Sequence, residues 1–183
     1  MFEPARGDGP EERYRVLQAA ASVLERTRYQ SLKVRQVLTA AEVSTSTFYR
    51  YFTSKSDLML ALLREDADRM KVYLVGLMAE EVDPVARVEV WLRFGVRIAF
   101  DVEHFGQFRV YLDHELMRDV PRELAELNGR AVGPLREVIE EGTAQGIFHS
   151  GDAERDARAI HYYVRTYLMD IANGVLDRDP ETA

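Results

Sequence analysis

Polar side chains able to bind nucleic acid gather in one short stretch of the sequence, from Lys33 to Leu58. Four consecutive hydroxyl residues precede a tyrosine and an arginine, and basic residues flank them. The candidates are Lys33, Arg35, Ser44, Thr45, Ser46, Thr47, Tyr49, Arg50 and Lys55. Such groups donate hydrogen bonds to phosphate oxygens and base edges. We expect Thr45, Ser46, Thr47 and Tyr49 to meet bases or the nearby DNA backbone, and the remaining five to bind phosphate.

Two short helices must position these side chains. Residues 33–41 carry an apolar stripe at helical spacing, made by Val34, Val37, Leu38 and Ala41. Glu42 and Val43 form a turn, and Ser44 is a suitable N-cap for a second helix over residues 45–51. Ser54 to Asp57 resembles a capping box that opens the next helix. The pattern predicts a helix-turn-helix, which places its second helix in the major groove of DNA.

The same residues resemble the DNA-binding domain of TetR-family transcriptional regulators. The resemblance rests on Tyr29, Val43-Ser44, Thr47-Phe48-Tyr49, Tyr51-Phe52, Ser54-Lys55 and Asp57-Leu58, and it covers about residues 14–63. The family usually has glycine where this chain has Arg28, Glu42 and Ser46. A side chain at a left-handed turn position costs on the order of 1 kcal/mol. The resemblance implies a homodimeric repressor that leaves a palindromic operator when a small effector binds.

The rest of the chain predicts an all-α fold of eight or nine helices. We expect a disordered arm over residues 1–10, a three-helix DNA-binding head over 11–55, and a ligand-binding and dimerisation body over 56–183. Helices are expected at residues 11–27, 55–81, 84–101, 105–116, 121–145 and 153–176. Asp83-Pro84 is a helix-start signal, and Pro134 should kink or break the helix that contains it.

Charge is divided along the sequence in a way that suits DNA binding. The whole chain of 183 residues has a net charge of −7. Residues 11–55 hold eight basic and four acidic side chains, a net of +4, whereas residues 56–183 have a net of −10. A positive head on an acidic body orients a protein on phosphate and keeps DNA away from its other faces.

The body suggests an effector pocket and a subunit interface. Aromatic and polar residues of several helices are candidates for binding a small apolar or aromatic effector: Trp91, Phe94, Arg97, His104, Phe105, Phe108, Tyr111, Tyr163 and Tyr167. Aromatic residues at this spacing also suit a plain core. By resemblance, the two last long helices form the dimer interface, through Leu135, Val138, Ile139, Ile160, Val164, Leu168, Ile171 and Val175.

Two rival classes of function receive less support. An enzyme or metal site would have to use four scattered histidines, since the chain has no cysteine, Gly-rich phosphate loop or nucleophile elbow. We therefore expect no catalysis, metal or cofactor. A degenerate head used for protein contact is the alternative to DNA binding, and Glu42 and Ser46 are its best support. The absence of a signal peptide and of a long apolar run predicts a cytoplasmic protein without a membrane contact.

Overall fold

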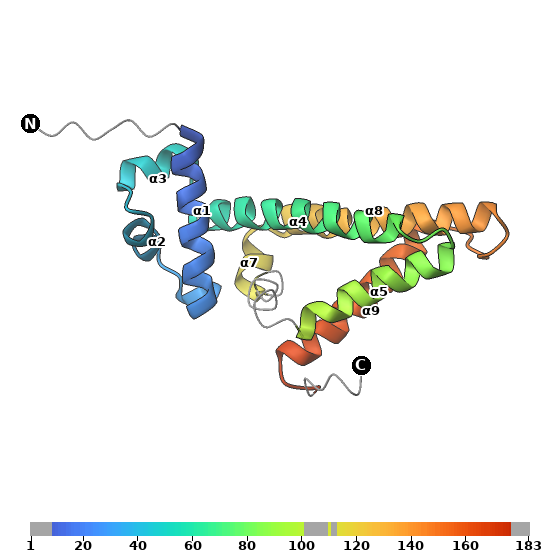
Figure 1. Cartoon of the computed structure of the whole chain (residues 1–183). Helices are drawn as coiled ribbons and strands as arrows, with labels where there is room; N and C mark the ends of the chain where they lie inside the picture. The colour runs from blue at the N-terminus through green and yellow to red at the C-terminus, as the bar shows by residue number, and fades with distance from the viewer. Residues whose placement is uncertain (1–8, 101–109, 111–112, 177–183) are drawn as a thin grey trace, which may run out of the picture.

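The computed structural model describes residues 9–100, 110 and 113–176, and its regular structure is entirely helical over these ranges. In chain order the elements are α1 (Gly9–Arg26), the 3₁₀ turn η1 (Tyr29–Ser31), α2 (Val34–Ala41), α3 (Thr45–Tyr51), α4 (Lys55–Ala79), α5 (Pro84–Phe100), α7 (His114–Asp119), α8 (Pro121–Ala144) and α9 (Ala153–Ala172). The chain forms an elongated molecule with α1, α2 and α3 at one end and α5, α8 and α9 toward the other (Figure 1). The predicted all-α class, with an N-terminal helix-turn-helix head and a helical body, is confirmed.

The head is built around a small buried core. Val16, Leu17 and Ala20 of α1 are fully buried, as are Val37 of α2 and Phe48 of α3. These positions follow the helical spacing of the sequence, so one face of each helix turns inward. The inward faces leave the polar faces of α2 and α3 at the surface, where the candidate DNA contacts lie.

Helix α4 joins the head to the body. Its first half places Leu58, Leu62 and Leu63 in the core that contains the head, and its second half places Leu74 and Met78 in the core of the body. Ser54 caps the helix by accepting a hydrogen bond from the backbone N–H of Asp57 at 3.0 Å. The helix continues through Gly76 as one element of 25 residues, so both cores share a single rigid segment.

The body packs α5, α8 and α9 around Trp91. This side chain is 4% exposed, and its indole N–H donates to the carbonyl of Ala131 at 3.0 Å. Helices α5 and α9 approach closely at Gly95, where an added Cβ would lie 2.9 Å from a methyl group of Val164. A side chain at Gly95 would therefore force these helices apart.

Two sequence-based boundaries in the body need correction. Helix α8 continues through Pro134 as one element, so of the expected kink or break the break is wrong. Proline removes one backbone hydrogen bond, and Pro134 is buried beside Leu135 in the body. The last helix ends at Ala172 rather than at Leu176, because Gly174 adopts a left-handed φ of 72°.

Helix α7 connects the body to the head. Leu116 of α7 and Leu124 of α8 belong to the same buried cluster as the head residues. The Tyr29 hydroxyl lies 3.2 Å from the Ser56 hydroxyl and donates to the Asp119 carboxylate at 3.5 Å. The head core therefore extends beyond residue 55 and includes the short helix α7.

Candidate nucleic-acid interface

The start of α3 is organised by Ser44. Its hydroxyl oxygen accepts a hydrogen bond from the backbone N–H of Thr47 at 3.0 Å. It also lies 2.8 Å from the Ser46 hydroxyl and 2.9 Å from the Thr47 hydroxyl. This network satisfies a backbone N–H that the first turn of a helix leaves without a partner, and it fixes the hydroxyl groups at the surface end of the helix.

Tyr49 projects from the middle of α3. It is 58% exposed, while the neighbouring Phe48 is completely buried. The two rings meet edge to face, with centroids 5.2 Å apart and planes at 89°. The buried ring supports the base of Tyr49 and leaves the phenol accessible, and Thr45 and Ser46 are exposed beside it. These are suitable groups for base edges in a groove.

Arg50 is held by the first helix. Its guanidinium donates to the Glu12 carboxylate at 3.0 Å, and the same carboxylate oxygen accepts from the Tyr51 hydroxyl at 3.0 Å. The Arg50 guanidinium also lies 5.1 Å from the centroid of the Tyr51 ring. A phosphate that bound Arg50 would have to share it with Glu12 or displace Glu12, which sequence reasoning did not anticipate.

The flanking basic residues differ in orientation. Lys33 and Arg35 are exposed at the start of α2. Lys55 instead turns inward, where its ammonium donates to the carbonyl of Tyr29 at 3.1 Å and lies 4.0 Å from the centroid of that ring. Lys33 and Arg35 remain accessible to phosphate, whereas Lys55 stabilises the packing of η1 on α4.

The turn between α2 and α3 is closed by Glu42. This residue has φ 54° and ψ 43°, and its backbone N–H donates to the carbonyls of Leu38 and Thr39. It is the only non-glycine residue with positive φ in the described part of the chain. The left-handed turn expected from the sequence is thus present, and Glu42 occupies it. Glycine would adopt this conformation without a steric cost.

Comparison with known proteins fits this geometry. Residues 16–62, which contain the whole helix-turn-helix, match the family model of bacterial regulatory proteins of the tetR family. The helix-turn-helix head is therefore a TetR-family DNA-binding domain. The chain is 28% identical over 139 residues to the HTH-type transcriptional repressor NicS of Pseudomonas putida, an alignment that covers 73% of this chain and 64% of NicS.

Solved structures of similar shape have low sequence identity to this chain. The fatty acid degradation regulator FadR from Bacillus halodurans has a TM-score of 0.77 and 18% identity, and the match covers 96% of this chain and 90% of FadR. FadR from Bacillus subtilis, in complex with stearoyl-CoA, has a TM-score of 0.72 and 19% identity, with 90% of each chain covered. At these identities the likeness establishes the fold.

Five of the nine predicted effector residues lie in the described part of the chain, and their surroundings differ. Trp91 is buried in the body core, and Tyr167 is partly buried against it. Phe94 packs against Tyr73 with ring centroids 5.9 Å apart. Arg97 is exposed, and Tyr163 is 77% exposed. The remaining candidates, His104, Phe105, Phe108 and Tyr111, lie outside the described residues.

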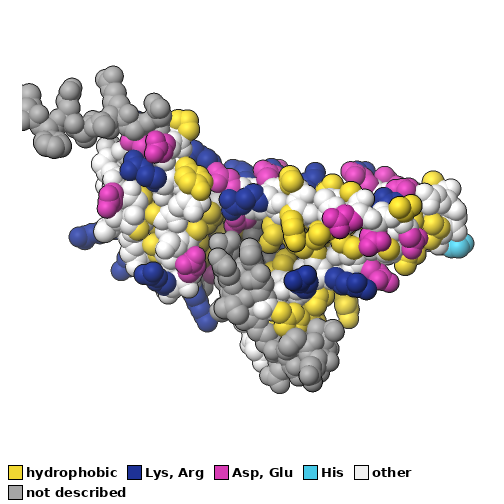
Figure 2. All heavy atoms as spheres, viewed as in Figure 1, with side chains coloured by type: hydrophobic (Ala, Val, Ile, Leu, Met, Phe, Trp, Pro, Cys, Tyr) yellow, Lys and Arg dark blue, Asp and Glu magenta, His cyan; other side chains and the backbone are white. Residues whose placement is uncertain are grey.

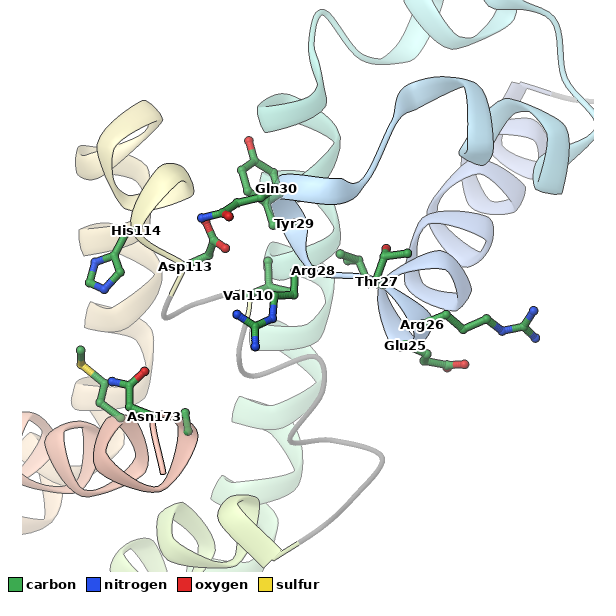
Figure 3. Close-up of a pocket in the computed structure, with 13 residues that line it drawn as sticks. Glu25, Arg26, Thr27, Arg28, Tyr29, Gln30, Val110, Asp113, His114 and Asn173 are labelled. Atoms are coloured by element: carbon green, nitrogen blue, oxygen red, sulfur yellow. The ribbon is translucent and has the colours of Figure 1, made fainter. Parts of the chain in front are cut away.

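A cavity of about 350 Å³ lies where the head meets the body. It is lined by residues 24–30 on the head side and by Val110, Asp113, His114, Met169, Ala172 and Asn173. Arg28 extends toward Val110, whereas Arg26 points away (Figure 3). Sequence periodicity gave no signal for this cavity, because its walls come from helix ends that meet only in the folded chain.

A second cavity, of about 220 Å³, lies between α8 and α9 beside α7. Its lining includes Met117, Asn128, Arg158, His161 and Arg165. Neither of the two cavities contains any of the nine residues expected to bind an effector. Among the described residues, no group of three or more histidine, aspartate or glutamate side chains is arranged to hold a metal ion, and no helix is long and apolar enough to cross a membrane.

Most of the residues expected at the dimer interface are used within the chain. Six of the eight are buried in the body core, each at most 7% exposed: Leu135, Val138, Ile139, Val164, Leu168 and Ile171. Ile160 packs partly against the same core, and Val175 is exposed beyond the end of α9. The apolar stripes of α8 and α9 therefore pack these helices against α4 and α5 of the same chain, and the assignment of the eight residues to a subunit interface stays a prediction.

Proposed function

We propose that this TetR-family chain is a homodimeric transcriptional repressor that binds a palindromic DNA operator and leaves it when a small effector binds the body. The observation that carries the proposal is α3 itself, a capped helix with a buried Phe48 and an exposed Tyr49 beside accessible hydroxyl groups. The names of NicS as a repressor and of FadR as a degradation regulator support it. The proposal also places the protein in the cytoplasm, the compartment that contains its operator DNA.

Direct DNA contact is proposed for two sets of side chains. Thr45, Ser46 and Tyr49 would meet bases, with Thr47 held against the Ser44 cap. Lys33 and Arg35 would bind phosphate, and Arg50 would do so after release from Glu12. Lys55 contributes through the positioning of η1, so its substitution should reduce stability as well as DNA affinity.

Selection from random DNA duplexes tests the proposal. The enriched sequences should be palindromic, and fluorescence anisotropy should show affinity falling steeply as salt rises, because bound phosphates release counterions. Arg35→Ala should weaken binding and lower the salt slope by about one unit. Arg93→Ala removes an exposed arginine of α5 and should leave DNA binding unchanged.

Two outcomes would contradict DNA binding. If no duplex is enriched, or if binding is weak and insensitive to salt, the head serves protein contact, and Glu42 becomes the first residue to substitute. If Arg35→Ala, Arg50→Ala and Tyr49→Ala all bind the selected duplex like the parent, α3 does not read the DNA.

A two-fold dimer is proposed because two heads can then occupy successive major grooves, roughly 34–36 Å apart. The contacts must involve side chains that the core leaves free, and Tyr163 of α9 is the most exposed aromatic residue described. Sedimentation equilibrium should show a dimer that Tyr163→Arg weakens. Tyr73→Arg, at a tyrosine of α4 with 60% exposure, is the matched control, and a parent protein that is monomeric at micromolar concentration would refute the proposal.

A further inference from the structure

The cavity beside α7 has two chemically different walls. On the α8 side, Leu124, Ala125 and Val132 provide apolar surface. On the α9 side stand Arg158, His161 and Arg165, which lie three or four positions apart and so share one face of the helix. A ligand that fits both walls must combine an anionic group with a small apolar part.

The α9 wall carries two arginines. No acidic residue lines the cavity, and outside it the Glu154 carboxylate pairs with Arg158 at 2.6 Å. Burial, followed by the charges of Arg165 and Arg158, lowers the pKa of His161 to about 4. The imidazole is therefore neutral at pH 7, and the arginines supply the charge.

His161 also has an unused hydrogen-bonding atom. Its Nε2 is buried and has no hydrogen-bond partner within the described structure. Its ring is held edge to face against Trp91, with centroids 6.1 Å apart. A buried polar atom without a partner costs free energy, and a ligand oxygen that reached a protonated Nε2 would remove that cost.

We propose that this cavity binds a small organic carboxylate, with its oxygens toward Arg165 and His161 and its apolar part against Leu124 and Val132. A volume of about 220 Å³ is below the roughly 300–1,000 Å³ of pockets for drug-sized ligands, which suits a single ring or a short chain. This inference rests on the proposed function, since it assigns the effector class and the effector site.

The same cavity contacts the helix that holds the head. The Arg165 guanidinium lies 3.3 Å from the sulfur of Met117 in α7, and Met117 packs against the buried cluster that includes the head. At the end of α7, Asp119 accepts a hydrogen bond from Tyr29. A carboxylate that draws Arg165 into the cavity changes its contact with α7, and α7 can transmit that change to Tyr29.

Benzoate and benzamide provide a matched test, because they have the same shape and differ in charge. Calorimetric titration of the full chain should show benzoate binding at least tenfold more tightly than benzamide. Arg165→Gln should abolish this preference, and Arg93→Gln, at an exposed arginine of α5, should preserve it. His161→Gln provides a second variant if the substitution at Arg165 impairs folding, and it should weaken benzoate binding.

Proton and carbon signals of the His161 ring locate the bound molecule. They should shift on addition of benzoate and be insensitive to protein concentration. Equal binding of benzoate and benzamide, or unchanged binding by both variants, would overturn the proposal. Shifts of the His161 ring signals with protein concentration, in the absence of benzoate, would also overturn the proposal. They would mean that a second copy of the chain fills the cavity.

The DNA readout separates this inference from the proposed function. Benzoate should weaken binding of the parent to its selected duplex at least severalfold and have no such effect on Arg165→Gln. If DNA binding is intact but benzoate does not bind, the cavity inference fails and the repressor proposal stands. If benzoate binds as described but no duplex is ever selected, the repressor proposal fails and the carboxylate site stands without its effector role.

Discussion

Replacing Glu42 with glycine should stabilise the protein. Glu42 adopts a left-handed conformation with φ 54°, which costs an L-residue roughly 1–2 kcal/mol. Glycine removes that cost, but it also gives the unfolded chain more conformational freedom. This freedom offsets roughly 0.5–1 kcal/mol of the gain in the free energy of unfolding. The net gain in the free energy of unfolding should be about 0.5–1 kcal/mol, or a rise of about 1–4 °C in Tm for a chain of this length.

Urea unfolding of Glu42→Gly, with Glu42→Gln as the control, measures this effect without an operator. Glutamine removes the charge and keeps the steric cost, so its stability should stay within about 0.5 kcal/mol of the parent. Both variants lose the Glu42 carboxylate. A gain in DNA affinity shared by both would therefore show that this negative charge weakens DNA binding. If Glu42→Gly is no more stable than Glu42→Gln, the reasoning about backbone conformation is refuted.

Three further predictions concern contacts within the head and body. Tyr29→Phe removes the hydroxyl that bonds Asp119 and should lower the free energy of unfolding by about 1 kcal/mol in urea titrations. Ser44→Ala removes the acceptor for the backbone N–H of Thr47 and should cost about 1 kcal/mol by the same assay, with weaker DNA binding. Because burial lowers the pKa of His161 from 6.5 to about 4, the unfolded chain binds more protons in this interval. The contribution of neutral His161 to the free energy of unfolding is therefore complete above about pH 6.5. It should decline as pH falls toward 4, by up to about 3 kcal/mol. His161→Phe should remove that slope from the parent's pH profile.

Local signals in the sequence were sufficient to predict the helix-turn-helix of the head. The bounds of α3, the Ser44 and Ser54 caps and the turn at Glu42 all depend on residues within one or two helical turns. Short-range hydrogen bonds and steric limits determine such features, so residue type and spacing predict them well. The orientation of Lys55 was not accessible in this way, because it depends on Tyr29, which lies 26 positions away.

Longer-range packing explains what the sequence could not predict in the body. The stripe containing Leu135 and Leu168 showed that α8 and α9 each bury one face, but periodicity does not identify what covers that face. In the structure α4 and α5 of the same chain cover it. Likewise Trp91 and Tyr163 have similar chemistry and opposite burial, and only the three-dimensional arrangement distinguishes them.

The single rod of α4 has a mechanical consequence. Its 25 residues span about 37 Å, at 1.5 Å per residue, and its two halves are fixed in different cores. As a lever, a tilt of about 5° at the body end moves the head end by about 3 Å. In the proposed two-fold dimer this doubles to about 6 Å between heads, against a groove spacing of roughly 34–36 Å. A side-chain adjustment too small to disturb either core is thus enough to take one head out of register with its half-site.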